Sequence, residues 1–419
     1  MKNFRHIFIY ILTIYILTSC VENKTLYETY FTDQRARINI VFQGDAYSQK
    51  ASIKEIYKES VWSGSKNNLV DTLYYGEYRY SLYTKDGQLI FSKGFNNLFS
   101  EWRTIEQAKL TTNEFVESHW IPFPKQIVDF VLYYRDKSSG EFEELHRETI
   151  DPNSKNISIP KEFNYQIDTI QYSGNFSNKV DIVFVAEGYS HNESDKFKDD
   201  VNRATEYLFS MEPYSTRRSD FNVWALNSFN DQDDKTPLSS TFSTFGIDRY
   251  LTIPDHSSLG AILHNSHNDA VYILVNSSQY GGGGIYNYYA IGVSDHNLYG
   301  ELFVHEFGHS FGGLGDEYYS SQVAYEEFYN LNIEPWEPNL TTRVNFSNKW
   351  ESLINKETPI PTPNSYEYKN TIGLFEGGGY MSKDIYRPYL TCRMKENSAP
   401  DFCPVCIRAI NKIIDSYVK

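Results

Sequence analysis

One stretch of the chain has the residue types and the spacing of a zinc-binding helix, His305-Glu306-Phe307-Gly308-His309. Residues four apart lie on one face of a helix, so both imidazoles can reach the same ion. Glu306 follows the first histidine directly, and its carboxylate can take a proton from a water whose pKa a zinc ion lowers. The motif therefore predicts zinc as the cofactor and metal-assisted hydrolysis with Glu306 as the general base.

A catalytic zinc ion also needs a third protein ligand and one open position. No histidine follows His309, which excludes a histidine ligand downstream. The continuation from Ser310 to Tyr318 is similar to the metzincin pattern, in which a glycine turns the chain and the third ligand follows three residues later. With Gly313 as this pivot, the third ligand is Asp316, because glycine tolerates the positive φ that ends the helix.

Three other acidic residues are alternative third ligands. The chain departs from the commonest metzincin pattern by one extra residue before the glycine and by an aspartate in place of a histidine. Glu317 is therefore the main alternative, and Glu326 or Glu327, further along the chain as in gluzincins, is the next. A carboxylate suits zinc as well as an imidazole does.

Two residues near the C-terminus are candidates for supporting roles. In metzincins a methionine on a tight turn forms an apolar floor beneath the zinc site, and Met394 is a better match than Met381. Tyr386, beside Arg387, is a candidate oxyanion stabiliser, because a phenol can donate to the developing charge. A structural role is an equal alternative for Tyr386.

The elements that must position these residues alternate between strands and helices, as in an α/β domain. Apolar runs and helical periodicity predict strands at 180–186, 221–226, 271–275 and 285–293, and helices at 193–211 and 296–312. The four glycines Gly281 to Gly284 predict a mobile turn. We expect strand 285–293 at a sheet edge, where an extended peptide could pair with it, with pockets around Tyr286, Tyr288 and Tyr289.

Residues 21 to about 150 favour strands, with a hairpin signal at Asp86-Gly87. Aromatic residues make up 16% of the chain, including 35 Tyr and 27 Phe, and these residue types favour sheets. The sequence therefore predicts a multidomain α+β protein. An antiparallel β-sandwich is expected over residues 21–160 and an α/β zinc-peptidase domain over residues 161–419.

The N-terminus predicts export. Lys2 and Arg5 precede the apolar run Ile7 to Leu17, and Leu17-Thr18-Ser19-Cys20 resembles a bacterial lipobox. Residues 1–20 are thus expected to be a lipoprotein signal peptide, with Cys20 acylated. The protein would be anchored in the bacterial cell envelope, at the outer membrane or the cell surface.

The net charge disfavours some classes of partner, and the cysteines near the C-terminus predict a disulfide. With 39 basic and 54 acidic residues, the net charge of −15 disfavours binding of nucleic acid or of anionic lipid through the surface field. Two of Cys392, Cys403 and Cys406 are expected to form a disulfide in an oxidising compartment. The pair Cys403-Pro404-Val405-Cys406 could also be a redox pair or half a zinc site, but there is no second Cys-x-x-Cys.

The segment from His305 to Tyr318 resembles the signature of the IgA-peptidase family of bacterial zinc metallopeptidases. Three other segments also resemble this family: Val180–Gly188, Asp248-Arg249-Tyr250 and Cys392–Cys406. The β-rich half is similar to the N-terminal domain that many members of the family carry. The resemblance implies a metzincin-like catalytic domain, zinc and hydrolysis of a protein or peptide substrate. It does not imply cleavage of IgA, and the oligomeric state is left open.

Two other functions stay open at this point. One is a zinc amidase that acts on peptidoglycan. The other is a surface-anchored, glycan- or protein-binding lipoprotein whose peptidase domain is weakly active or inactive.

Overall fold

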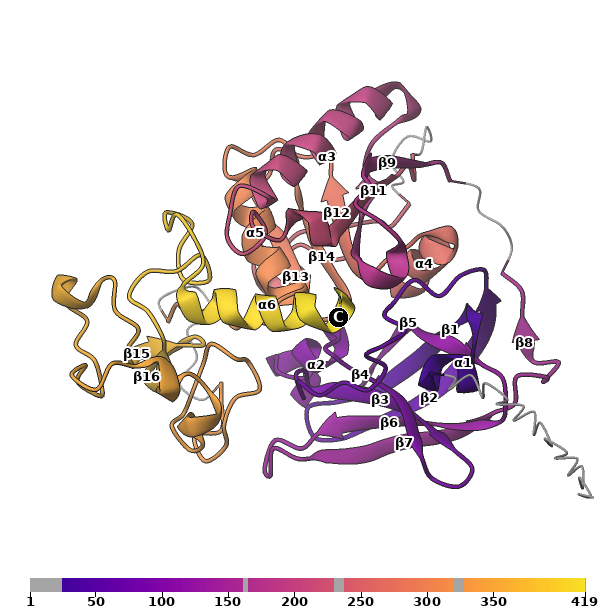
Figure 1. Ribbon diagram of the computed structural model, residues 1–419, viewed down its shortest axis with the longest axis horizontal. Helices are drawn as coiled ribbons and strands as arrows, with labels where there is room; N and C mark the ends of the chain where they lie inside the picture. Colours follow the sequence, from indigo (N-terminus) through magenta and orange to yellow (C-terminus); the bar gives the residue numbers. More distant parts are fainter. Residues whose placement is uncertain (1–24, 161–164, 230–236, 320–327, 419) are drawn as a thin grey trace, which may run out of the picture.

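The structure, a computed structural model, describes residues 25–160, 165–229, 237–319 and 328–418. Cys20 and the expected signal peptide lie outside these ranges, as do Glu326 and Glu327. Among the helices within these ranges, none combines the length and the apolar character needed to cross a membrane. The fold is mixed α/β, with four sheets and few long helices (Figure 1).

The N-terminal half consists of two four-stranded sheets that share one hydrophobic core. The first has the order β5-β1-β2-β8 and the second the order β4-β3-β6-β7. Their bounds are β1 Phe31–Gly44, β2 Gln49–Glu59, β3 Tyr78–Thr84, β4 Leu89–Phe95, β5 Asn113–Pro124, β6 Val128–Arg135, β7 Phe142–Ile150 and β8 Ile157–Ser158. All pairs are antiparallel except β2 with β8. The β-rich character expected of this half is confirmed, and β3 and β4 flank the predicted Asp86-Gly87 turn.

Two short helices belong to this half, α1 (Leu26–Tyr30) and α2 (Leu98–Trp102). Both begin at side-chain caps, since Thr25 and Asn97 each accept a hydrogen bond from a backbone N–H of the first turn.

The second half is built on a six-stranded sheet of the order β13-β14-β12-β10-β11-β9. The strands are β9 Ile167–Gln171, β10 Val180–Glu187, β11 Phe221–Leu226, β12 Ala270–Val275, β13 Gly282–Ile285 and β14 Tyr289–Val293. The four inner strands are parallel, and the edge strands β9 and β13 run antiparallel to their neighbours. β10 is buried along its whole length, as its largely apolar sequence predicts for an inner parallel strand.

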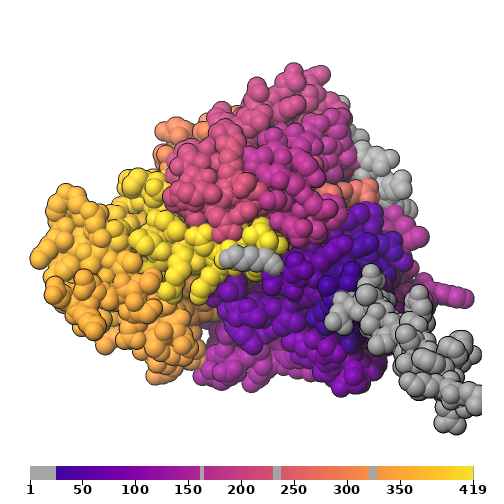
Figure 2. Space-filling model, viewed as in Figure 1, coloured from indigo at the N-terminus to yellow at the C-terminus, as the bar shows by residue number. Residues whose placement is uncertain are grey.

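Helices cover both faces of this sheet. Side chains of α3 (Ser194–Leu208), α5 (Tyr299–Ser310) and α6 (Pro404–Val418) share a core with one face. The other face packs on α4 (His256–Ile262) and on residues of α2 and β5 from the N-terminal half. The C-terminal helix α6 lies between the sheet and the N-terminal half, and its end reaches the surface there (Figures 1 and 2).

The two halves are joined by buried polar contacts. Arg35, 2% exposed, pairs with Glu59 at 2.8 Å and donates to the Leu263 carbonyl at 2.7 Å. Asn96 donates its backbone N–H to the carbonyl of Tyr286, and Asn287 donates to the carbonyl of Gly94. The N-terminal half is therefore packed directly behind the elements that precede α5.

The remaining chain is largely irregular. It carries the hairpin β15 (Phe375–Gly378) and β16 (Met381–Arg387), seen in orange at the left of Figure 1. Short 3₁₀ helices lie in the connections of the whole chain: Glu106–Lys109, Phe176–Asn178, His191–Glu193, Arg218–Asp220, Thr244–Gly246, Leu263–Asn265, Phe346–Asn348, Glu351–Leu353 and Tyr366–Tyr368.

The prediction of an edge strand at 285–293 is wrong. Ile285 is the last residue of β13, and Tyr289–Val293 is β14. β14 is not an edge strand, because it pairs with both β12 and β13. The three tyrosines proposed as pocket residues are buried, and Tyr288 stacks on His119 of the N-terminal half with ring centroids 5.3 Å apart. The edge is β13, which contains three of the four glycines expected to form a mobile turn.

Glycine in β13 has a packing reason. A Cβ at Gly284 would lie 2.4 Å from the carbonyl oxygen of Glu306, and one at Gly282 would lie 2.9 Å from the side chain of Glu306. Only a strand without side chains can approach α5 this closely. The low strand propensity of glycine hid this strand from sequence reasoning.

Candidate metal and active site

Helix α5 places the two motif histidines on one face, with their Nε2 atoms 3.2 Å apart. The Nδ1 atom of His305 lies 3.0 Å from the carbonyl oxygen of Arg393, and that of His309 lies 2.7 Å from the carbonyl oxygen of Leu314. A carbonyl only accepts, so each Nδ1 carries a hydrogen, and in the neutral imidazole each Nε2 presents a lone pair. In metal sites, such a hydrogen bond from the ring nitrogen that does not bind the metal orients the histidine.

A turn after α5 brings Asp316 back to the histidines. Gly313 has φ of +62°, and its N–H bonds to the carbonyl of His309 at 3.1 Å. Oδ1 of Asp316 then lies 3.1 Å from Nε2 of His305 and 3.3 Å from Nε2 of His309. Apart from these nitrogens, Oδ1 has no polar partner among the described residues.

The electrostatics of this group suit a cation. Burial lowers the pKa of His309, but the charge of Asp316 outweighs burial and raises it to about 9. The pKa of Asp316 is held well below its usual range, because the two imidazoles outweigh the effect of burial. Without a metal ion, the imidazole of His309 therefore holds a proton, which a bound metal ion would replace.

The three donor atoms fit one tetrahedral ion. Ligand distances of about 2.0–2.2 Å require donor separations of about 3.3–3.5 Å. The observed separations of 3.2, 3.1 and 3.3 Å are close to this. His305, His309 and Asp316 therefore form a set that could hold zinc, and the structure brings together the three ligands chosen from sequence.

Glu317, the main alternative ligand, is not in this set. Its side chain is fully buried and turns away from the histidines, with Oε1 3.0 Å from Nδ2 of Asn339 and 3.2 Å from Sγ of Cys406.

Glu306 lies beside the histidines, against β13. Burial raises its pKa, and the two histidines offset only part of that effect. A carboxylate with a raised pKa is a stronger base, which suits proton removal from a water.

Three residues that line the cleft, Tyr380, Arg249 and Tyr318, were not chosen as site residues from the sequence. The hydroxyl of Tyr380, in the turn between β15 and β16, donates to Oδ2 of Asp316. The neighbouring Gly379 N–H donates to the Asp316 carbonyl at 2.7 Å, so the hairpin holds this loop from both sides. Arg249 donates to the hydroxyl of Tyr318 at 2.9 Å. Gly377-Gly378-Gly379 signals a tight turn in the sequence but says nothing of what lies beside it.

The histidines and Glu306 open into a cleft of about 1330 Å³. Its walls include β13, Arg249 and Tyr318, the segment around Trp336, and Glu101 of the N-terminal half. Pockets for small ligands are typically about 300–1000 Å³, so this cleft can hold a longer molecule.

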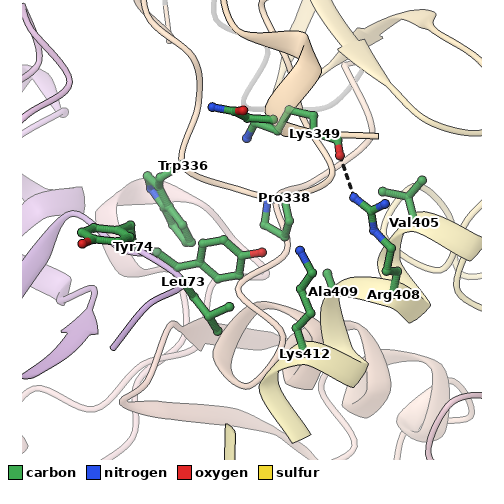
Figure 3. Close-up of a pocket in the computed structure, with 11 residues that line it drawn as sticks. Leu73, Tyr74, Trp336, Pro338, Lys349, Val405, Arg408, Ala409 and Lys412 are labelled. Atoms are coloured by element: carbon green, nitrogen blue, oxygen red, sulfur yellow. Dashed lines mark hydrogen bonds between the residues drawn. The ribbon is translucent and has the colours of Figure 1, made fainter. Parts of the chain in front are cut away.

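A second, smaller pocket of about 170 Å³ is separate from the cleft. Figure 3 shows Trp336 and Lys412 beside it and Arg408 donating to the Lys349 carbonyl, at 2.6 Å. It contains neither motif histidine nor a carboxylate, so it is not a second hydrolytic centre.

Met394 lies directly against α5. It is fully buried, and a Cβ at Gly308 would be 2.6 Å from its Sδ atom. This position supports the interpretation of Met394 as an apolar floor. Met381 instead lies beside Tyr329, whose N–H points to its sulfur at 3.4 Å.

Tyr386 does not line the cleft. Its ring is 8% exposed, packs in the core shared with α6, and has the Arg343 guanidinium over it at 5.7 Å. The structural alternative for Tyr386 is therefore favoured, and Tyr318 and Tyr380 are the tyrosines near the metal ligands.

The expected disulfide is absent. Cys392, Cys403 and Cys406 are all free and buried, and the Sγ atoms of Cys392 and Cys406 are 3.8 Å apart.

Comparison with known families places the chain among the peptidases. The model of the IgA Peptidase M64 family matches residues 169–370 and 364–414, and that of the Peptidase M64 N-terminus matches residues 26–146. The chain belongs to this peptidase family, which confirms the resemblance seen in the sequence. No curated protein matches the chain.

Proposed function

We propose that the protein is an exported, zinc-dependent endopeptidase. The single observation that carries the proposal is the convergence of Nε2 of His305, Nε2 of His309 and Oδ1 of Asp316 at tetrahedral separations. Glu306 lies next to them, at the floor of a cleft large enough for a peptide. Membership of a peptidase family supports the same reaction.

A metzincin-like arrangement of the catalytic half accounts for the site. Its elements are the helix α5 with two ligands, the glycine turn to the third ligand, the buried Met394 against the helix, and an antiparallel edge strand next to α5.

The zinc ion, when bound, would activate a water and polarise the scissile carbonyl. Glu306 accepts the proton of the attacking water and passes it to the leaving amine. Arg249 and Tyr318 line the same cleft as the histidines, and their N–H and O–H groups can donate to the carbonyl oxygen as its charge grows.

The substrate would lie along β13. Gly282 bonds with its N–H to the Arg249 carbonyl and with its carbonyl to the Leu251 N–H, away from β14. Backbone groups of an antiparallel strand alternate with a period of two, so those of Gly284 also point away from β14. The backbone groups of Gly282 are therefore already paired, and those of Gly284 are available to an extended peptide, without selecting side chains.

The substitution Glu306→Gln tests the reaction. It keeps the shape of the side chain but removes the base, so peptide hydrolysis should fall by about 10²–10⁴-fold while zinc stays bound. Glu301→Gln is the matched control, because it lies on the same helix and outside the cleft. Wild-type turnover by Glu306→Gln would exclude this mechanism.

The substrate class is tested by offering a mixed protein library and purified peptidoglycan to the same enzyme. We expect peptide fragments from the library and no released muropeptides. Products from peptidoglycan alone would assign an amidase, and zinc binding without either product would assign a binding protein.

Lipid anchoring at Cys20 is a separate part of the proposal. The lipobox-like sequence supports it. The wild-type protein should partition with membranes, and Cys20→Ala should be released or stay unprocessed. A wild-type protein found entirely in the soluble fraction would contradict anchoring.

A further inference from the structure

A second group of metal-type side chains lies behind the histidines. It comprises Glu317, Cys392, Cys403 and Cys406, whose ligand atoms all lie within 4.8 Å of one another. The exposed fractions of these residues are 0, 0, 2 and 0%. The loop after α5 and the C-terminal stretch 392–406 therefore converge on one closed volume.

Three separations between ligand atoms of this group are close to those of a tetrahedral zinc site. Zinc bonds of about 2.3 Å to sulfur and about 2.0–2.2 Å to oxygen imply sulfur–sulfur separations of about 3.8 Å and sulfur–oxygen separations of about 3.5 Å. Sγ of Cys392 is 3.8 Å from Sγ of Cys406. Oε1 of Glu317 lies 3.2 Å from Sγ of Cys406 and 4.0 Å from Sγ of Cys403.

Two backbone N–H groups point to sulfurs of the group. The N–H of Cys403 points to Sγ of Cys392 at 3.2 Å, and the N–H of Cys406 points to Sγ of Cys403 at 3.5 Å. Such hydrogen bonds to ligand sulfurs are typical of the outer shell of metal sites.

Glu317 supplies a second, independent indication of a bound ion. Its Oε2 atom is buried and has no hydrogen-bond partner among the described residues. A buried carboxylate oxygen without a partner is costly, and a cation bound by the Glu317 carboxylate reduces that cost.

We propose that Cys392, Cys403, Cys406 and Glu317 bind a second zinc ion. Four protein ligands leave no open position, so this ion is structural and not catalytic. It turns the single Cys-x-x-Cys of the sequence into a complete site by adding a cysteine and a carboxylate from elsewhere in the chain.

The position of the ion gives it a task at the catalytic centre. Glu317 follows Asp316, and Cys392 precedes Arg393, whose carbonyl orients His305. The N–H of Glu317 also bonds to the Met394 carbonyl at 2.9 Å. The ion would tie the third-ligand loop and the methionine turn to the beginning of α6.

A disulfide explains the group less well. A bond between two of the sulfurs would leave the third thiol buried beside the Glu317 carboxylate, with only the charge of Arg387 to offset that carboxylate. A redox pair would need an accessible sulfur for exchange, and all three are enclosed.

The double substitution His305→Ala/His309→Ala isolates this site, because it removes two catalytic ligands and leaves the cysteines intact. Measured by elemental analysis, the wild type should contain about two zinc ions per chain and the double variant about one. A mercurial that modifies thiols should release that ion. Cobalt in its place should show strong thiolate-to-cobalt charge-transfer absorption.

Two cysteine substitutions, one within the proposed site and one outside it, form a test and its control. Cys392→Ser in the double-variant background should abolish the remaining zinc, whereas Cys20→Ser, outside the group, should leave it in place. If Cys392→Ser does not fold, the cobalt spectrum of the double variant decides, since a weak octahedral spectrum would overturn the proposal. A folded double variant without zinc, whether its thiols are free or oxidised, would overturn it too.

These outcomes are independent of the proposed peptidase activity. Hydrolysis by the wild type with a zinc-free double variant would reject only the structural ion. Zinc in the double variant with an inactive wild type would reject only the peptidase.

Discussion

The closeness of β13 to α5 makes Gly284→Ala a sharp test of how the substrate strand and the metal helix are positioned. The added Cβ would lie 2.4 Å from the carbonyl oxygen of Glu306 and 2.8 Å from Cβ of His309, against an ordinary contact of 3.4–4 Å. Neither of these atoms can rotate out of the way. The strand must therefore move away from the helix by about 1 Å.

The displacement of β13 sets the expected losses of stability and of kcat/KM in Gly284→Ala. Overpacking of this kind costs about 1–3 kcal/mol of unfolding free energy. A displacement of about 1 Å between a substrate-binding element and the catalytic groups lowers kcat/KM by about 10²-fold. Zinc content should stay unchanged, because none of the three ligands is removed.

Gly283→Ala is the control from the same strand. Its Cβ would lie 2.7 Å from the Leu251 carbonyl oxygen and 2.9 Å from the ring of Tyr250, on the side away from α5. It should destabilise the protein by a similar amount but lose less kcat/KM on a cleaved library peptide. Equal losses of kcat/KM in both variants, or wild-type turnover by Gly284→Ala, would refute the reasoning.

Three other substitutions have expected outcomes. Tyr380→Phe removes the hydrogen bond to Oδ2 of Asp316 and should weaken zinc affinity by about 10–100-fold in a chelator competition, and unchanged affinity would deny the hydroxyl its positioning role. Met394→Ala should lower the unfolding free energy by about 2–5 kcal/mol in urea, since the side chain is fully buried, and a loss well below that range would mean that the floor can collapse. Burial raises the pKa of Glu101 from 4.5 to about 7, so only the folded protein holds this proton between those pH values, and the stability it contributes is lost as the pH rises from 4.5 to 7. Glu101→Gln should therefore flatten that part of the stability curve and stabilise the protein at pH 8 by about 3 kcal/mol, and a curve that falls as steeply as that of the wild type would contradict the assignment.

Local sequence rules were enough for the centre of the site. The four-residue spacing of His305 and His309 requires only a helix, and the glycine at 313 indicates where the chain turns back to Asp316. The long apolar strands and the β-rich N-terminal half were also predictable, because their patterns depend on burial alone.

What could not be predicted depends on contacts between distant segments. Tyr380 reaches Asp316 from a hairpin far along the chain, and Arg249 lines the cleft from a loop that is hydrogen-bonded to β13. The glycines of β13 adopt a strand against local propensity because α5 leaves no room for side chains. Glu317, considered from sequence as a catalytic ligand, faces the cysteines instead.

Hydrolysis before and after removal of the catalytic metal tests the central claim most directly. Mild chelation should take the ion from the open histidine site first, and peptide cleavage should disappear with it. Adding back one equivalent of zinc per chain should restore cleavage in the wild type and not in Glu306→Gln. Peptide cleavage that persists in the metal-free protein would contradict the account.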